Sequence, residues 1–172
     1  MRTKLRLYAV VFATVVLGML VAGTGVAAAH GKDKKTLRIV ATEIQSEFID
    51  LGDPGPSLGD ELVFSERLFI RGEEVGESGG VCTVTKASPP YDVLTFHCVA
   101  TLSLERGQIT LQGLIEVQGE DDPGPFTVAI TGGTGKFRCA SGEASVRVGD
   151  ERSVYRLRFD SCKKDHKDKK HD

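Results

Sequence analysis

Tryptophan is absent from the 172-residue chain, and aromatic residues make up only 6% of it. Sugar-binding surfaces depend on exposed aromatic rings, so a lectin-like surface is disfavoured. Only four histidines occur, and His97 is the single one inside the body of the sequence. We interpret His97 as a strand residue with a satisfied hydrogen bond. Because no G-x-S-x-G motif is present either, a hydrolase with a catalytic triad is disfavoured.

The first 29 residues resemble a targeting segment. Arg2, Lys4 and Arg6 precede the apolar stretch Tyr8–Val21, and small residues follow at 27–29. This order is typical of a secretory signal peptide that is cleaved after about Ala29, which predicts a secreted protein. An uncleaved membrane anchor is the alternative, although the apolar run is short for a membrane span.

The net charge and length of residues 30–172 limit the possible partners and the number of domains. Removal of Arg2, Lys4 and Arg6 takes the formal net charge from −2 to −5, which argues against a nucleic-acid partner. The length suits one domain. We expect a polar lead-in at 30–36, the folded domain at 37–162, and a charged, disordered tail at 163–172.

The domain shows no sustained helical period, and short alternating segments separated by turns predict an all-β fold. About eight strands in one domain indicate either a sandwich or a closed antiparallel barrel. We expect Arg71–Gly80, which is rich in glycine and glutamate, to form a turn region. The predicted strands are Leu37–Phe48, Asp60–Ile70, Val81–Thr85, Val93–Leu104, Ile109–Val117, Thr127–Ile130, Ala140–Val148 and Ser153–Asp160.

A glycine-rich segment, Gly132-Gly133-Thr134-Gly135, follows the strand at 127–130. It lacks the spacing of a phosphate-binding P-loop, and no helix follows it to bind an anion. We therefore interpret it as a structural corner, after which Lys136 and Phe137 restart an extended chain. The alternating residues at 140–148 support a strand there.

The four cysteines allow three disulfide connectivities, and hairpin register selects one of them. A hairpin centred on Pro89-Pro90 places Cys82 opposite Cys98 and Thr85 opposite Thr95. A second hairpin, centred between Asp150 and Glu151, places Cys139 opposite Cys162 and Glu143 opposite Arg158. Directly opposed residues lie near disulfide range, so we predict the bonds Cys82–Cys98 and Cys139–Cys162. A zinc site is disfavoured because no C-x-x-C spacing occurs, and no metal or cofactor is expected.

Several sequence blocks resemble the allene oxide cyclase and dirigent protein superfamily. The most specific is Phe126–Glu143, in which AITGG-x-G-x-F is similar to allene oxide cyclases and GGTGKFR-x-A-x-G to dirigent proteins. The resemblance covers about residues 37–160. The other blocks are ATEIQSE at 41–47, GDELVFSERLF at 59–69, GVCTV at 80–84 and GQITLQG at 107–113.

The resemblance implies an eight-stranded antiparallel β-barrel around an apolar cavity, commonly in a homotrimer. It also implies catalysis by positioning, in which a reactive apolar molecule of fatty-acid, phenolic or polyketide type is held for cyclisation or coupling without a nucleophile. Glu43 matches a glutamate that stabilises positive charge in the cyclases. Gln45 and Glu66 stand where the cyclases have asparagines, and Cys82 matches a cavity cysteine. The dirigent aspartates are not reproduced.

Three functions remain open from the sequence. The first is an isomerase-like barrel whose cavity is lined by Glu43, Gln45 and Glu66 as its polar groups. The second is a non-catalytic exported binding or envelope-associated barrel, and the third is a sandwich-type enzyme inhibitor. An open apolar cavity with Glu43 inside would favour the first, whereas a barrel filled with apolar side chains and Glu43 outside would favour the second.

Overall fold

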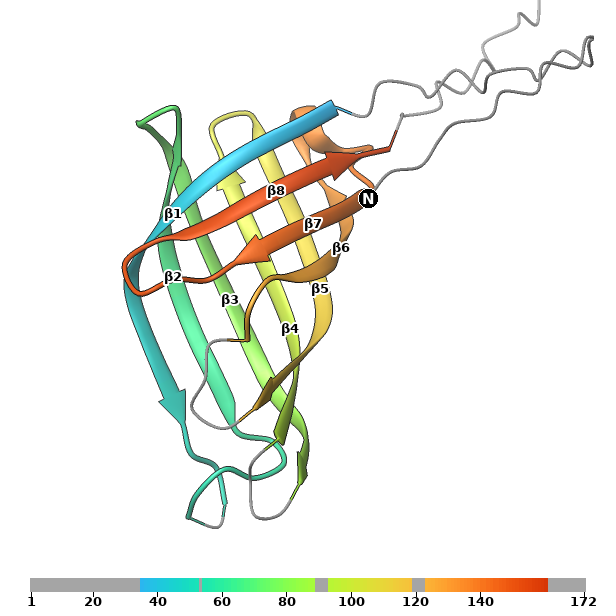
Figure 1. Cartoon of the computed structure of the whole chain (residues 1–172). Helices are drawn as coiled ribbons and strands as arrows, with labels where there is room; N and C mark the ends of the chain where they lie inside the picture. Colours follow the sequence, from blue (N-terminus) through green and yellow to red (C-terminus); the bar gives the residue numbers. More distant parts are fainter. Residues whose placement is uncertain (1–34, 53, 89–92, 119–122, 161–172) are drawn as a thin grey trace, which may run out of the picture. The chain divides into compact units, whose positions relative to one another are not determined.

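Eight antiparallel strands form a closed barrel in which each strand pairs with its neighbours in the sequence and β1 pairs with β8 (Figure 1). The computed structural model describes residues 35–52, 54–88, 93–118 and 123–160. The predicted closed barrel is therefore confirmed, and the open sandwich is excluded. The strands are β1 (Lys35–Ile49), β2 (Glu61–Ile70), β3 (Glu73–Ser88), β4 (Val93–Leu104), β5 (Gly107–Gln118), β6 (Phe126–Gly133), β7 (Gly142–Arg147) and β8 (Ser153–Phe159).

Two local predictions were wrong. The segment Arg71–Gly80 is a turn only at its first two residues, because β3 begins at Glu73 and pairs with both β2 and β4. Pairing on both sides outweighs the weak strand propensity of glycine and glutamate. The chain after the glycine-rich corner does not extend at once, since Gly135–Phe137 form a turn of 3₁₀ helix.

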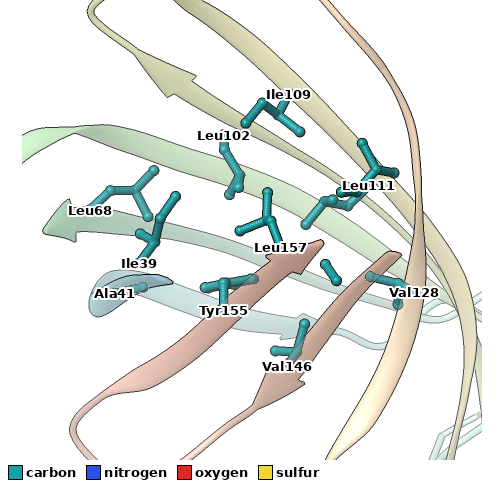
Figure 2. Close-up of a cluster of buried hydrophobic side chains, with 12 residues drawn as sticks. Ile39, Ala41, Leu68, Leu102, Ile109, Leu111, Val128, Val146, Tyr155 and Leu157 are labelled. Atoms are coloured by element: carbon teal, nitrogen blue, oxygen red, sulfur yellow. The ribbon is translucent and has the colours of Figure 1, made fainter. Parts of the chain in front are cut away.

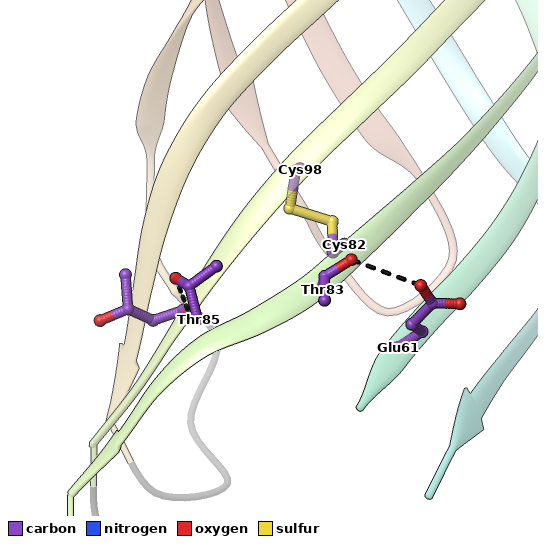
Figure 3. The surroundings of a disulfide bond; sticks show 6 residues. Glu61, Cys82, Thr83, Thr85 and Cys98 are labelled. Carbon is purple, nitrogen blue, oxygen red and sulfur yellow. Dashed lines mark hydrogen bonds between the residues drawn. A yellow bond between two sulfur atoms is a disulfide. The ribbon is translucent and has the colours of Figure 1, made fainter. Parts of the chain in front are cut away.

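Both predicted hairpin registers are observed, except beyond one bulge in the first hairpin. Cys82 pairs with Cys98, and their sulfur atoms form a disulfide (Figure 3). In the last hairpin Glu143 pairs with Arg158, and their side chains form an ion pair at 3.1 Å. The predicted pairing of Thr85 with Thr95 is wrong, because a bulge shifts the register and Lys86 pairs with Thr95.

The second predicted disulfide involves Cys162, which lies outside the described residues, so that bond stays a prediction. The same holds for the predicted signal peptide at 1–29, nearly all of the lead-in at 30–36, and the tail at 163–172. Among the described residues, no helix has the length and hydropathy needed to cross a membrane.

A cluster of buried apolar side chains packs inside the barrel and fills part of it (Figure 2). Ile39 on β1, Leu68 on β2 and Leu157 on β8 are fully buried there, and Leu102 and Ile109 complete the layer. Burial of each such side chain stabilises the fold by about 1.5–3 kcal/mol. We call this filled part the plug half.

The ladders that close the barrel lie mainly in this plug half. The β1–β8 ladder runs from Lys35 to Ala41 and stops there, although β1 continues to Ile49. The β5–β6 ladder likewise ends at Gln112, although β5 continues to Gln118. Beyond these points the wall consists chiefly of β1–β5, which reach further than β6–β8 (Figure 1). We call this second part the open half.

Candidate functional site

The open half contains a cavity of about 370 Å³. This volume lies in the range of small-molecule sites. Glu43 and Ser46 line the cavity and are also exposed, so the cavity communicates with solvent. Its wall is predominantly apolar, formed by Leu62, Phe64, Cys82, Phe96, Cys98, Ala100, Leu111, Ile115, Val117, Pro123, Phe126, Val128, Val146 and Val148, and its polar lining residues are Glu43, Ser46, Glu66, Gln112, Ser153 and Tyr155.

Polar side chains form the floor of the cavity where it meets the plug half. Every second side chain of a strand points into the barrel. On each strand, the last inward residue of the plug half and the first inward residue of the cavity are therefore two positions apart. At that step the residue type changes from aliphatic to polar on three neighbouring strands. The change occurs between Ala41 and Glu43 on β1, between Leu68 and Glu66 on β2, and between Leu157 and Tyr155 on β8.

Glu66 is the central residue of this floor and is only 6% exposed. Its Oε2 atom accepts two hydrogen bonds, one from the Ser78 hydroxyl at 2.7 Å and one from the Tyr155 hydroxyl at 2.7 Å. Ser78 lies directly opposite Glu66 on β3, whereas Tyr155 comes from β8, which is separated from β2 by β1. The two donors on one oxygen fix the orientation of the carboxylate. They also supply the hydrogen bonds that a buried carboxylate requires.

The second carboxylate oxygen of Glu66 faces the cavity. Oε1 takes part in neither of the two hydrogen bonds. No fully buried side-chain oxygen among the described residues lacks a partner, so Oε1 is not sealed in the protein. Since Glu66 lines the cavity, its free oxygen is available to a ligand.

Tyr155 is held in its protonated form by its burial and by this contact. Burial raises the pKa of Tyr155 well above its ordinary value, and the charge and hydrogen bond of Glu66 raise it further. A tyrosine that stays protonated can keep donating to Glu66 over the whole physiological range.

Tyr155→Phe is expected to lower the free energy of unfolding by about 2 kcal/mol at neutral pH, because a buried carboxylate loses a donor. The raised pKa means that the folded state holds this proton longer than the unfolded state. The advantage of the wild type is therefore complete below the ordinary tyrosine pKa of about 10 and shrinks as pH rises through the folded value. Urea denaturation at a series of pH values measures it.

Glu66→Gln provides the control, since it removes the charge but retains a hydrogen-bond acceptor. In this variant the phenol of Tyr155 should ionise at a lower pH than in the wild type, as followed by ultraviolet absorbance. Ionisation of Tyr155 at the ordinary tyrosine pKa of about 10 in the wild type would contradict the buried contact.

The structure brings Glu43 and Glu66 together, but not Gln45. Glu43 pairs with Glu66, and Gln45 pairs with Ser65, the residue adjacent to Glu66 on β2. Ile44 therefore has no partner position on β2 and forms a bulge in β1. In a regular strand residues 43 and 45 would share a face. The bulge instead brings Ser46 to the cavity and places Gln45 at a second, smaller hollow.

The disulfide forms part of the cavity wall. Cys82 and Cys98 are both buried and both line the cavity, and their Cα atoms are 3.9 Å apart. Figure 3 shows the bond spanning β3 and β4, next to the hydrogen bond that joins Thr83 to Glu61. As an oxidised pair these sulfurs supply an apolar surface and no nucleophile.

Sequence reasoning did not identify Tyr155 and Ser78 as site residues. The predicted hairpin centred between Asp150 and Glu151 also places Tyr155 opposite Val146, and this pairing is observed, but it gives Tyr155 no role in a site. Its bond to Glu66 joins residues 89 positions apart, which no local pattern reveals. His97 fulfils its expected role, since its Nε2 is hydrogen-bonded to Gln112 at 2.8 Å.

The family model described as "Allene oxide cyclase barrel like domain" matches residues 35–160, which include every strand of the barrel. No curated protein sequence matches the chain. The comparison with solved structures does find related barrels.

One solved structure, a pyocyanin demethylase, is 33% identical to this chain. The match covers 73% of this chain and 100% of the demethylase, with a TM-score of 0.64. Two others share the fold at lower identity. A pterocarpan synthase dirigent protein is 18% identical, with 84% and 96% of the two chains covered and a TM-score of 0.51. The Diels Alderase AbmU from Streptomyces koyangensis is 16% identical, with 77% and 72% covered and a TM-score of 0.55.

Proposed function

The chain belongs to the allene oxide cyclase barrel like domain family, and we propose on that premise that its cavity binds a small, largely apolar organic molecule and promotes a reaction of it. The observation that carries this proposal is the floor of the cavity. There the fixed carboxylate of Glu66 presents one oxygen to a space that is otherwise mostly apolar. A single oriented polar group in an apolar pocket is typical of sites that position a substrate.

The chemistry follows from the residues that surround the ligand. The apolar wall restricts the conformations of a bound molecule, which favours one geometry for a cyclisation or coupling. Oε1 of Glu66 stabilises positive charge that develops near it or accepts a proton, while Ser78 and Tyr155 keep the carboxylate in place. Because the disulfide occupies both cysteines of the wall, no thiolate nucleophile takes part.

Glu43 is the second polar group of this proposal. It lines the cavity and lies beside Glu66, which is the placement that distinguishes a ligand-steering barrel from a filled one. The plug half shows that the barrel is partly filled, but the open half retains the cavity. Gln45, which lies at the other hollow, has no part in the proposed reaction.

The second candidate is a binding protein that does not transform its ligand, and one experiment separates the two. Pyocyanin is the first compound to test, because the relative with 33% identity is a pyocyanin demethylase. The purified protein is mixed with pyocyanin, binding is measured by calorimetry, and products are followed by liquid chromatography with mass spectrometry. The same assay is applied to any compound that native mass spectrometry finds retained.

Catalysis predicts conversion by the wild type and a loss of about 100-fold in kcat/KM for Glu66→Gln. The matched control is Glu116→Gln, which changes an exposed glutamate on β5 that does not line the cavity. Binding without conversion would establish the second candidate. Failure to bind pyocyanin, together with no retained compound, would overturn the proposed function.

Export from the cytoplasm is part of the proposal. Its support is the basic and apolar N-terminal sequence together with the Cys82–Cys98 disulfide, a bond that persists in oxidising compartments. Mass spectrometry of protein from culture fluid tests it. Cleavage after about Ala29 is the expected result, and intact protein confined to the cell would contradict it. Under native conditions the same measurement would detect the homotrimer that the family resemblance implies.

A further inference from the structure

The charge of the cavity is one-sided. Its ionisable lining residues are Glu43, Glu66 and the protonated Tyr155. Among the described residues, no lysine, arginine or histidine lines it. The low dielectric of an apolar wall strengthens the field of these carboxylates relative to water. A ligand inside the cavity therefore experiences a negative potential.

The two carboxylates are also neighbours with no cation between them. Glu43 and Glu66 are directly paired across β1 and β2, and both line the cavity. Like charges in directly opposed positions of a sheet destabilise it. The described ion pairs, Arg67 with Glu74 and Arg158 with Glu143, do not involve either residue. Neither carboxylate is therefore neutralised by a protein cation in the described ion pairs, and both can interact with a positively charged ligand.

We propose that the cavity selects an organic cation, specifically a flat apolar molecule with a delocalised positive charge such as an N-alkylated heteroaromatic ring. This inference rests on the proposed function and names its substrate class. The positive ring would contact Oε1 of Glu66 at the floor, with Glu43 nearer the solvent. The rings of Phe64 and Phe96 line the same space and favour a cation over their faces.

Two other positive ligands fit the cavity less well. A divalent metal ion requires several oxygen or nitrogen ligands, and the described residues contain no group of three such side chains that could hold one. A compact ammonium ion is strongly hydrated, and the mostly apolar wall cannot replace its water. An apolar molecule with a delocalised positive charge can interact favourably with both the carboxylates and the apolar wall.

Three probes of nearly equal shape test the charge preference: N-methylacridinium, acridine under mildly alkaline conditions where it is neutral, and acridine-9-carboxylate. Binding to the purified protein is measured by fluorescence titration at low and high salt. We expect the cation to bind at least about 10-fold more tightly than neutral acridine, and the anion more weakly than both. The preference for the cation should decrease as salt increases.

Variants identify the source of the preference. Glu66→Gln should abolish most of it, and Glu43→Gln should reduce it by a smaller factor because this residue is exposed to solvent. Glu116→Gln on the outer surface should leave it unchanged. Circular dichroism checks that each variant is folded. If Glu66→Gln is unfolded, comparing Glu43→Gln with Glu116→Gln still shows whether the cation preference depends on a carboxylate of the cavity.

The outcomes separate this inference from the function on which it rests. Equal binding of acridine and N-methylacridinium would overturn the charge selection and leave the small-molecule site intact. A preference for the cation that persists in both Glu43→Gln and Glu66→Gln would also overturn it. No binding of any of the three probes would count against the cavity as a ligand site, and so against both.

Discussion

Replacing both Cys82 and Cys98 with alanine is expected to lower the free energy of unfolding by about 3 kcal/mol. The disulfide closes a loop between residues 16 positions apart, and the loss of that constraint enlarges the conformational freedom of the unfolded chain. The substitution also removes two sulfur atoms from the cavity wall, so ligand affinity should fall as well. Urea denaturation measures the first effect, and fluorescence titration of a bound probe measures the second.

Reductant supplies the control for this variant. Adding it should destabilise the wild type more than the double variant, because only the wild type has the Cys82–Cys98 bond to lose. If the double variant unfolds at the same urea concentration as the wild type, the bond contributes nothing to stability. Such a result would contradict the stabilising role assigned to the disulfide.

Gly76→Ala is expected to lower the free energy of unfolding by about 3 kcal/mol or more. It should be the most destabilising glycine-to-alanine substitution in β3. A Cβ atom at this position would overlap the backbone carbonyl oxygen of Ser103 on β4. Backbone atoms in a paired strand cannot move aside as a flexible side chain can, so the two strands must separate. The φ angle of 151° adds backbone strain for any residue with a side chain.

Gly79→Ala, in the same strand, is the matched control. The nearest atom to its added Cβ is the Phe64 carbonyl oxygen at 3.9 Å, which is an ordinary contact. Its effect should therefore be within about 0.5 kcal/mol of the wild type. Thermal and urea denaturation of the two variants give the comparison. Equal stability of the two would show that the tight approach of β3 and β4 at Gly76 is unimportant.

The strands and two hairpin registers were predictable because they depend on local information. Alternating side chains define a strand, and counting outward from the predicted hairpin centres at Pro89-Pro90 and Asp150-Glu151 gives the residues that are opposed. Cys82 with Cys98 and Glu143 with Arg158 followed directly from this counting. The family resemblance added the closure of the barrel, which periodicity alone had left open beside a sandwich.

The remaining features depend on contacts that local patterns do not contain. The bulge at Ile44 changes which residues of β1 enter the cavity, and alternation gives no signal for an extra residue. The glycines of β3 resemble a turn in sequence, yet Gly76 is required because a Cβ would overlap the backbone carbonyl oxygen of Ser103 on β4. Tyr155 and Glu66 meet only because the barrel closes and brings β8 near β2.

The division of the barrel into a filled end and a hollow end has a consequence for protein engineering. Most of the buried aliphatic side chains belong to one end, and most of the residues that would touch a ligand belong to the other. Leu111, Val128, Val146 and Tyr155 belong both to the buried cluster and to the cavity wall. A library that randomises wall positions such as Leu62, Phe96 and Ile115 would therefore leave the principal source of folding energy untouched. Laboratory evolution toward new compounds should tolerate many simultaneous changes there, provided that Glu66, Ser78 and Tyr155 are kept.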